Sequence, residues 1–468
     1  MTSDRSTADR LLIVLAVGVV ALLLVAIGAL VVVRDLRSPG SVALASPSAP
    51  AATGATRVAS APPSGAPPSA AAIGSPSPSA APSASTGSGL AAEIAAIEAQ
   101  VPPIRQLQPT APVPDRIVDP ATAAAELQRE YDRSNPPAQV AAVQHLWQRL
   151  GLLPSGTDLR ALELQAQQSQ VIGFYDDTTR TLTVVQQGAT FGPLDEMTLA
   201  HEYTHALQDQ NFGLSSLKID TPDQTDRDLA RQALVEGDAT ATMTAWAIAH
   251  LTPDQLQQVV NAAGLPESQA ELAKLPAILQ RLIAFPYQDG ATFVGRLLQQ
   301  PGGWTAVDAA YRHPPDSTAQ ILHPELYLAH REPIQVALPD VVGPLGPGWK
   351  ESTSDTLGEL IMQVWLAQGV DGTTAANVSS GWAGDRIGSY DGPGGAWAVV
   401  WLTAWQSTAD ARVFEPAAGQ VIRQLATGGT VAAVVRLTTL AGAGGAREAV
   451  LIANSQVTLT RLERLVAP

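Results

Sequence analysis

The stretch His201-Glu202-Tyr203-Thr204-His205 is an HExxH motif, and it decides how the rest of the chain is interpreted. Residues four positions apart lie one turn apart on the same face of an α-helix, so the two imidazoles can reach one metal ion. The carboxylate between them then lies beside that ion. Two neutral imidazoles and a neighbouring carboxylate are the groups that hydrolytic zinc enzymes use. We therefore expect His201 and His205 to bind zinc and Glu202 to act as the general base.

The residues on either side of the motif predict a helix from Leu194 to Phe212. Gly192-Pro193 breaks the chain before this helix, and Gly213 follows it as a C-terminal cap would. Asp195 and Glu196 fall in its first turn, where the helix dipole favours acidic side chains. The motif is thus expected in the middle of a long helix.

A third protein ligand is expected, because two histidines bind zinc too weakly and a catalytic site keeps its fourth position for water. The continuation HExxHxxGxxH is excluded, since Gln208 and Asn211 stand where its glycine and third histidine would be. Another solution takes a glutamate from the next long helix, which the sequence predicts over Asp226–Leu251. In that helix the segment ALVEGDA offers Glu236 as the third ligand.

Helical periodicity favours Glu236 as an inward-pointing side chain. Steps of three and four residues place it on one side of the helix with apolar residues. These residues are Leu229, Ala233, Met243 and Ala247. A carboxylate on that side needs a partner, and a metal ion supplies one. Gly237 suggests that this helix closely approaches the helix that carries His201.

Other acidic residues of the same helix are alternative third ligands. They are Asp226, Asp228 and Asp238. Asp238 is otherwise interpreted as a solvated helical charge.

The segments HEYTHALQDQ (residues 201–210) and ALVEGDA (residues 233–239) resemble the gluzincin group of zinc metallopeptidases, in particular bacterial membrane-anchored or surface proteins of that type. The resemblance covers residues 194–243. It implies that His201 and His205 are the histidine ligands. It also implies that Glu202 is the catalytic base and Glu236 the distal ligand.

One position departs from the gluzincin pattern. Many members carry an aspartate one turn after the ligand glutamate, where it orients a histidine, and this chain has Thr240 there. Asp209, one turn after His205, is a candidate for that orienting contact. The alternative interpretation of Asp209 is a surface acid near a helix end.

The motif and the resemblance together imply hydrolysis of a peptide bond. Zinc polarises the scissile carbonyl and lowers the pKa of a zinc-bound water, while Glu202 takes the proton of that water and passes it to the leaving amine. A tyrosine or histidine from the later part of the chain is expected to stabilise the oxyanion. The candidates are Tyr287, Tyr311, His313, His323 and Tyr327. We prefer His323 among them, although a core histidine with satisfied hydrogen bonds is the commoner structure for such a residue.

Secondary-structure signals elsewhere predict further helices and one small sheet. Helical signals dominate from Asp119 to Gly151, and two β-prone runs between Val171 and Val185 predict a hairpin before the motif. The strand Gly173–Tyr175 is a candidate edge for pairing with an extended substrate, with ordinary sheet packing as the alternative. After residue 300 we expect loops rich in Gly, Pro and Trp with short helices, and strands from Thr430 to Leu465.

Composition excludes several classes of function. The net charge is -15, and no cluster of Lys or Arg occurs, which argues against binding to nucleic acid. The chain has no cysteine, so disulfides, thiolate catalysis and Cys-bound metals are excluded. His, Asp and Glu remain as the strong metal ligands.

The N-terminal region predicts a membrane anchor and a tether. Leu11 to Val33 is an uninterrupted apolar run that is long enough to cross a hydrocarbon core of about 30 Å. A cleaved signal peptide with Ala43-Leu44-Ala45 as its cleavage site is the alternative. Residues 38–89 are rich in Ala, Ser, Pro and Gly, which predicts a disordered linker. We expect the folded part to lie outside a bacterial cell, with a cytoplasmic location as the alternative.

The sequence as a whole predicts an α+β, mainly helical, zincin-like protein with a small sheet or hairpin before the HExxH helix. Its predicted parts are a cytoplasmic tail (1–10), a transmembrane helix (11–33), a disordered linker (38–89), a metallopeptidase domain (90–330) and a C-terminal subdomain packed on it (331–468). The expected function is that of a membrane-anchored zinc metalloendopeptidase that acts on a peptide or protein substrate. The alternatives are a non-catalytic zinc-containing surface binding module and a zinc hydrolase of a non-peptide substrate.

Overall fold

The computed structural model describes residues 86–466, with gaps at residues 169–172, 186–190, 264–269, 271, 427–428 and 438–445. The predicted cytoplasmic tail, transmembrane helix and most of the predicted linker lie outside the described residues. From Thr86 onward the end of that linker belongs instead to helix α2. Within the described ranges, no helix combines the length and the apolar character that a membrane span requires.

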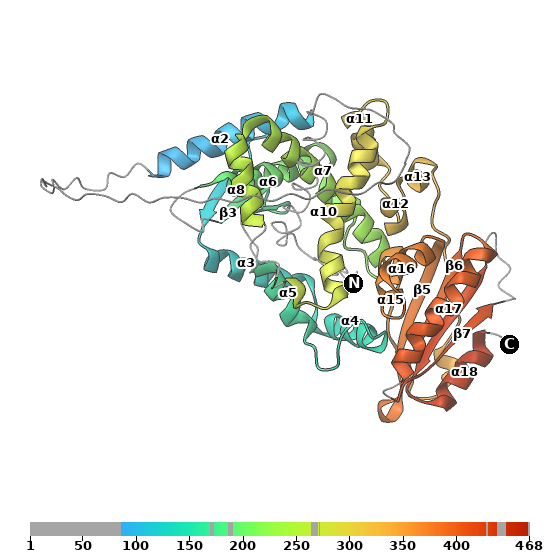
Figure 1. The fold of residues 1–468 in the computed structure, drawn as a ribbon. Coiled ribbons are helices and arrows are strands. Elements are labelled where there is room, and N and C mark those ends of the chain that lie inside the picture. The colour runs from blue at the N-terminus through green and yellow to red at the C-terminus, as the bar shows by residue number, and fades with distance from the viewer. Residues whose placement is uncertain are drawn as a thin grey trace, which may run out of the picture.

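Helices form most of the structure before residue 350. In chain order they are α2 (Thr86–Arg105), α3 (Pro120–Ser134), α4 (Pro137–Arg149), α5 (Leu159–Gln168), α6 (Pro193–Phe212), α7 (Thr225–His250), α8 (Pro253–Ala263), α10 (Ala277–Leu298), α11 (Trp304–Arg312), α12 (Thr318–Leu322), α13 (Pro324–Leu328) and α14 (Val342–Leu345), with the 3-10 turn η1 (Leu214–Leu217) after α6. Helix α7 is central in this part, since it packs against α6 and α10, and α2 contacts both α6 and α7 (Figure 1).

The helix that carries the motif has the bounds that its flanking residues predict. It begins with Pro193 at its first position, and the carboxylate of Asp195 accepts a hydrogen bond from the backbone N–H of Gly192. It ends where Gly213 takes a left-handed conformation with φ of 70°. All five motif residues are buried in the middle of this helix, so the predicted placement of the motif is confirmed.

A three-stranded sheet precedes the motif helix. Its strands are β1 (Asp115–Val118), β2 (Gly173–Asp176) and β3 (Thr181–Val185), in the order β1-β3-β2. Strands β2 and β3 pair antiparallel, which confirms the predicted hairpin. Strand β1 pairs in parallel with β3 and was not predicted, because a parallel partner far away in the chain leaves no turn signal beside the hairpin. Among the described strands β2 therefore lies at the edge of its sheet, and it packs against α6.

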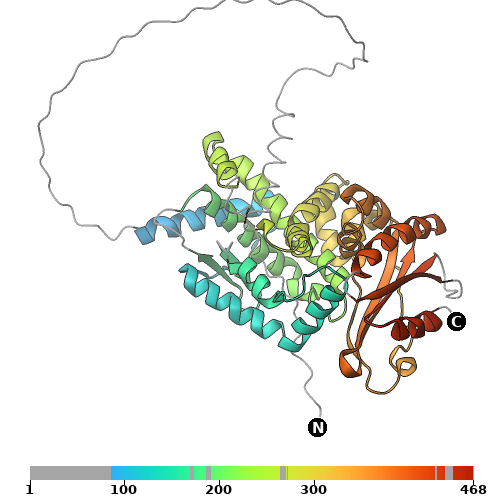
Figure 2. The same cartoon turned by 60° about the horizontal axis from the view of Figure 1, so that its bottom comes forward.

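The C-terminal part is built on a second, larger sheet. Its elements are β4 (Lys350–Asp355), α15 (Gly358–Leu366), α16 (Gly372–Ser379), β5 (Trp382–Asp391), η2 (Pro393–Gly395), β6 (Trp397–Trp405), α17 (Thr408–Leu425), β7 (Val431–Leu437), β8 (Arg447–Ala453) and α18 (Gln456–Val466). The five strands are antiparallel throughout, in the order β4-β5-β6-β8-β7. Helices α17 and α18 lie on opposite faces of the sheet, as Figure 2 shows.

Alternation along the central strand β6 explains this layering. Val399 and Trp401 join the hydrophobic cluster that contains residues of α17. Val400 and Leu402 join the cluster that contains residues of α18. Successive side chains of a strand point to opposite faces, so a strand covered on both sides is apolar at every position.

The fold-class prediction was wrong about the sheet content. It expected one small sheet in a mainly helical protein, whereas the described residues form two sheets, the larger of them in the C-terminal part. The Trp-rich segments from Trp382 to Trp405 were predicted as loops and are the strands β5 and β6. The apolar run of β6 has no period-2 alternation, because both faces of this strand are buried. The transmembrane helix of the same prediction lies outside the described residues.

Candidate metal centre

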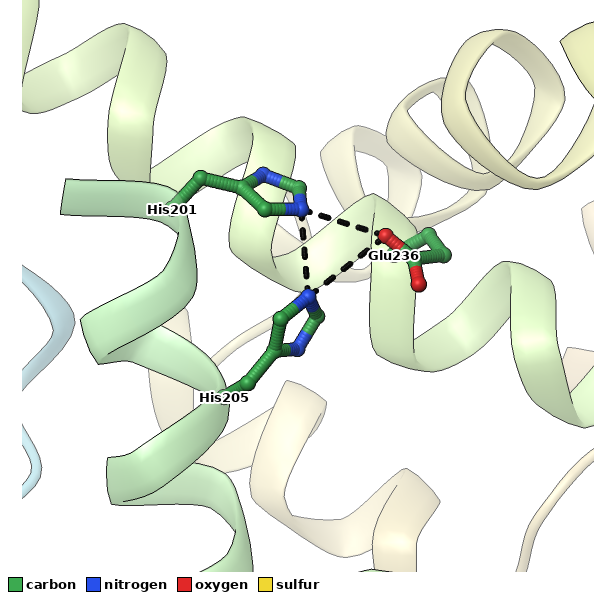
Figure 3. Close-up of side chains that lie close together, drawn as sticks. All are labelled: His201, His205 and Glu236. Atoms are coloured by element: carbon green, nitrogen blue, oxygen red, sulfur yellow. Dashed lines mark hydrogen bonds and ion pairs between the residues drawn. The ribbon is translucent and has the colours of Figure 1, made fainter. Parts of the chain in front are cut away.

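Helices α6 and α7 bring His201, His205 and Glu236 together (Figure 3). The two Nε2 atoms of His201 and His205 lie 3.1 Å apart. The Oε2 atom of Glu236 lies 3.1 Å from Nε2 of His201 and 3.6 Å from Nε2 of His205. The three side chains, from residues that the sequence predicted as ligands, form a cluster that can hold a metal ion.

The spacing and the chemistry of these three atoms fit zinc. Zinc binds histidine nitrogen at about 2.0–2.1 Å with tetrahedral angles, so two of its ligand atoms stand about 3.3–3.4 Å apart. The separations in the cluster, from 3.1 to 3.6 Å, lie on both sides of that value. Two imidazoles and one carboxylate are also a common set for a catalytic zinc site.

Burial and mutual charge shift the pKa values of the cluster. Burial lowers the pKa of His201. Burial acts in the same direction on His205, but the charges of Glu236 and Glu202 outweigh it and raise the pKa of His205. Burial would raise the pKa of Glu236, but the charge on His205 and the hydrogen bond with His201 hold that pKa below its usual range. The cluster therefore keeps an ionised carboxylate in the protein interior, where a cation is a suitable partner.

Glu202 lies beside the cluster and is held by the edge strand β2. The backbone N–H of Tyr175 donates to its Oε2 atom at 3.1 Å. Glu202 is 4% exposed, and this burial raises the pKa of its carboxyl group to about 8. A carboxyl group with a pKa near neutrality can accept and release a proton at physiological pH, which is the property a general base needs.

A buried hydrogen-bond network supports His205 from behind. Its Nδ1 atom lies 2.8 Å from Oε1 of Gln208, which is on the same helix. The amide nitrogen of Gln208 donates to the backbone carbonyl of Val235 and to Asp238 on α7. Asp238 also accepts from Arg105, the last residue of α2. His205 is thus connected to two other helices.

Asp238 is not the solvated charge that the sequence suggested. It is fully buried, and its carboxylate accepts hydrogen bonds from Arg105, Tyr311 and Gln208. No local sequence pattern indicates this network, because Arg105 lies 133 residues away from Asp238 in the chain. The contact between Gln208 and His205 could have been predicted from the sequence, since residues three positions apart lie on the same face of a helix.

The predicted oxyanion donors lie at different places in the structure. Tyr287 is closest to the cluster: its ring centroid lies 6.1 Å from that of His201, and burial and the charge of Glu236 raise the pKa of its hydroxyl group. His323 pairs instead with Glu359, with 2.9 Å between Nε2 and Oε1. The structure therefore brings Tyr287, not the preferred His323, into contact with the cluster.

The other three candidates make contacts of their own. Tyr311 binds Asp238, and Tyr327 donates to the backbone carbonyl of His313. Tyr311 thus belongs to the network behind His205.

Asp209, the candidate for orienting a histidine, makes its hydrogen bonds elsewhere. Asp209 accepts hydrogen bonds from the hydroxyl of Tyr175 and from the backbone N–H of Leu214, so it ties the hairpin and the end of α6 together. Thr240 is buried, and neither its hydroxyl nor Nδ1 of His201 has a hydrogen-bond partner within the described part of the chain. The two histidines differ, therefore, in the support that they receive.

A cleft of about 580 Å³ opens onto the cluster. His205 and Glu236 line it together with residues of the strand β2. Further lining residues come from α3 and from the segment that follows α6. The apolar lining residues are Leu127, Phe174, Leu214, Ile219 and Val235. The cluster is accordingly buried among side chains yet reachable by a ligand from one side.

Comparisons with known proteins add little about this centre. Residues 345–464 match the model of a family described as a domain of unknown function, DUF8575, and this range holds the five-stranded sheet rather than the cluster. No curated protein matches the chain. The chain is similar to a solved structure from Chloroflexus aurantiacus described as a proposed hydrolase with a novel fold, at 16% identity and a TM-score of 0.33, over 51% of this chain and 88% of that chain. At this TM-score the similarity shows neither the fold nor the activity of this chain.

Proposed function

We propose that this protein is a zinc-dependent metallopeptidase of gluzincin type. The observation that carries the proposal is the convergence of His201 Nε2, His205 Nε2 and Glu236 Oε2 at separations of 3.1 to 3.6 Å, next to Glu202 and at the end of a cleft. A structural zinc site has no use for an additional carboxylate, and it closes all four positions with protein ligands. A centre with three ligands, a neighbouring base and an open side suits hydrolysis better.

Residues of this chain would divide the chemical work as follows. His201, His205 and Glu236 would hold the ion, which when bound supplies a Lewis acid for the scissile carbonyl and for water. Glu202 accepts a proton from the attacking water and returns it to the leaving amine. The N–H of Tyr175 fixes the carboxylate of Glu202 in position for both transfers.

The shape of the cleft supports a peptide as substrate. Strand β2 is an edge strand of its sheet and lines the cleft, so an extended chain that enters there can add to the sheet through backbone hydrogen bonds. The apolar side chains that line the cleft can receive side chains of that substrate.

A comparison of two glutamine variants on one helix tests the proposal. Full-length wild type, Glu202→Gln and Glu196→Gln are loaded with zinc and incubated with a peptide library, and cleavage is followed by mass spectrometry. Glu196 is the matched control, because it lies in the first turn of the same helix and is partly exposed. We expect all three proteins to bind zinc and only Glu202→Gln to lose cleavage, by about a thousandfold or more.

Two other outcomes would replace the proposal. Zinc binding without cleavage by any of the three proteins favours a binding module. Cleavage of ester or amide model compounds, with every library peptide left intact, favours a hydrolase of non-peptide substrates.

A further inference from the structure

The orientation of the Gln208 side chain follows from the atoms that surround it. Its amide nitrogen lies 3.0 Å from the carbonyl oxygen of Val235 and 3.1 Å from Oδ2 of Asp238. A carbonyl oxygen and a carboxylate accept hydrogen bonds and cannot donate them, so the group that faces them must be the NH₂ group. The amide oxygen of Gln208 consequently faces His205.

That orientation dictates which ring nitrogen of His205 carries a proton. An amide oxygen accepts only, so Nδ1 of His205, at 2.8 Å from it, must be the N–H donor. In the neutral imidazole the lone pair then lies on Nε2. Nε2 is the atom that points to His201 and Glu236 in the cluster.

Asp238 and Arg105 hold this arrangement in place. Arg105 donates through Nε to Oδ1 of Asp238 at 2.6 Å, and Tyr311 donates to Oδ2 at 2.7 Å. With Gln208 the carboxylate has three donors, and Arg105, Gln208 and Asp238 are each 0% exposed. Hydrogen bonds of fixed direction in a dry interior exchange partners only at a high cost in free energy, so the network has one stable arrangement.

We propose that Gln208 is a positioning residue for the metal centre, and that Asp238 and Arg105 lock its amide so that His205 presents an unprotonated Nε2 to the ion. The inference rests on the proposed zinc centre. It makes α2, which ends at Arg105, part of the support of that centre. His201 has no equivalent partner among the described residues, so the network acts on one ligand of the two.

Two substitutions at position 208 separate positioning from simple bridging between helices. Gln208→Leu removes both the acceptor for His205 and the donors to α7. Gln208→Glu keeps an acceptor for Nδ1–H of His205, loses the donation to the Val235 carbonyl, and puts a second carboxyl group beside Asp238, where the two groups share one proton. If the acceptor positions His205, Gln208→Glu should retain zinc affinity; if the bridge to the Val235 carbonyl is what matters, both variants should fail alike.

The test measures the zinc dissociation constant of the full chain by competition with a chromophoric chelator. We expect Gln208→Leu to bind zinc 10- to 100-fold more weakly, as on loss of other partners of metal-bound histidines, and Gln208→Glu to stay within about threefold of wild type. The matched control is Gln210→Leu, which makes the same change on the same helix at a surface position bound to Thr110 and Ala111. Its affinity should equal that of wild type.

A spectroscopic measurement keeps the inference testable where a variant is less stable. In the zinc-loaded protein with ¹⁵N-labelled histidine, the Nδ1–H signal of His205 should exchange slowly with solvent in wild type and rapidly in Gln208→Leu. Equal affinity and equal exchange in wild type and Gln208→Leu would overturn the positioning role alone. An equal loss of zinc affinity in Gln208→Leu and Gln208→Glu would also overturn the positioning role. A wild-type protein that binds no zinc would instead contradict the proposed metal centre itself.

Discussion

Gly237 on α7 and Gly290 on α10 lie in backbone contact: a Cβ atom built on Gly237 would stand 2.2 Å from the carbonyl carbon of Gly290. A Cβ atom on Gly290 would in turn stand 2.2 Å from the carbonyl oxygen of Ala233. The sequence suggested that Gly237 brings α7 close to the helix of His201, and the structure shows that the close neighbour is α10 instead. This close contact between α7 and α10 lies directly beside Glu236, the residue that precedes Gly237.

Gly237→Ala should destabilise the protein. The new methyl group meets backbone atoms that cannot rotate away, so we expect a loss of about 1–3 kcal/mol or more in the free energy of unfolding, measured by chemical denaturation. The control is Gly295→Ala on α10, where a Cβ atom has nothing within 4 Å. It should be neutral or stabilising by up to about 1 kcal/mol, because alanine is the better helix former. Equal stability of the two variants would argue against the close approach.

Arg105→Ala should also destabilise the protein, for an electrostatic reason. Arg105 is fully buried and pairs with Asp238 and Asp308, so its removal leaves a buried carboxylate without its cation. We expect a loss of about 3–5 kcal/mol in metal-free protein. Arg129→Ala serves as control, since that side chain is 71% exposed and pairs with Glu126 at 3.9 Å, and it should change stability by less than about 0.5 kcal/mol. A small effect of Arg105→Ala would mean that water reaches Asp238.

Tyr287→Phe should weaken zinc binding. The buried ring of Tyr287 packs near His201, and burial and the charge of Glu236 raise the pKa of its hydroxyl group, so the variant removes a polar group beside the ligand carboxylate without changing the core. A decrease of about tenfold in zinc affinity is expected, as for other groups that orient metal ligands. Tyr327→Phe is the matched control, because its hydroxyl binds the carbonyl of His313 outside the centre. Similar zinc affinities in the two variants would mean that Tyr287 does not contribute to the metal centre.

Zinc binding should strengthen as the pH rises. The charges of Glu236 and Glu202 raise the pKa of His205 in the metal-free protein, and burial raises that of Glu202 to about 8. A metal ligand must be unprotonated, so at neutral pH zinc displaces at least one proton. The affinity should therefore grow by up to tenfold per pH unit from about pH 6 up to the pKa of His205, which is raised to about 9, and level off above it. Calorimetry in buffers of different ionisation enthalpy measures the proton release, and a flat affinity with no release would contradict the electrostatics of the cluster.

Local signals explain what the sequence could predict. The helix of the motif was predicted within one residue because Gly192-Pro193 and Gly213 act on their immediate neighbours. Glu236 was predicted as the third ligand because inward-pointing carboxylates show in the periodicity of a single helix. Both inferences need only residues that are close together in the chain.

Pairings between distant segments explain what was missed. Strand β1 lies far from β3 in sequence, and Arg105 lies 133 residues before Asp238, so neither contact leaves a local pattern. Strand β6 lacks the polar positions of a half-exposed strand, since its sheet is covered by α17 and α18. Tertiary packing decides these features, and single-sequence patterns do not report it.

The most direct test of the central claim is the zinc content of the purified full chain, measured by mass spectrometry of the metal after dialysis. We predict about one zinc per chain in wild type, less than about a tenth of that in Glu236→Ala, and the wild-type value in His323→Ala, whose side chain binds Glu359 instead of the cluster. A wild type that holds no zinc, or a Glu236→Ala variant that keeps a full equivalent, would contradict the proposed centre.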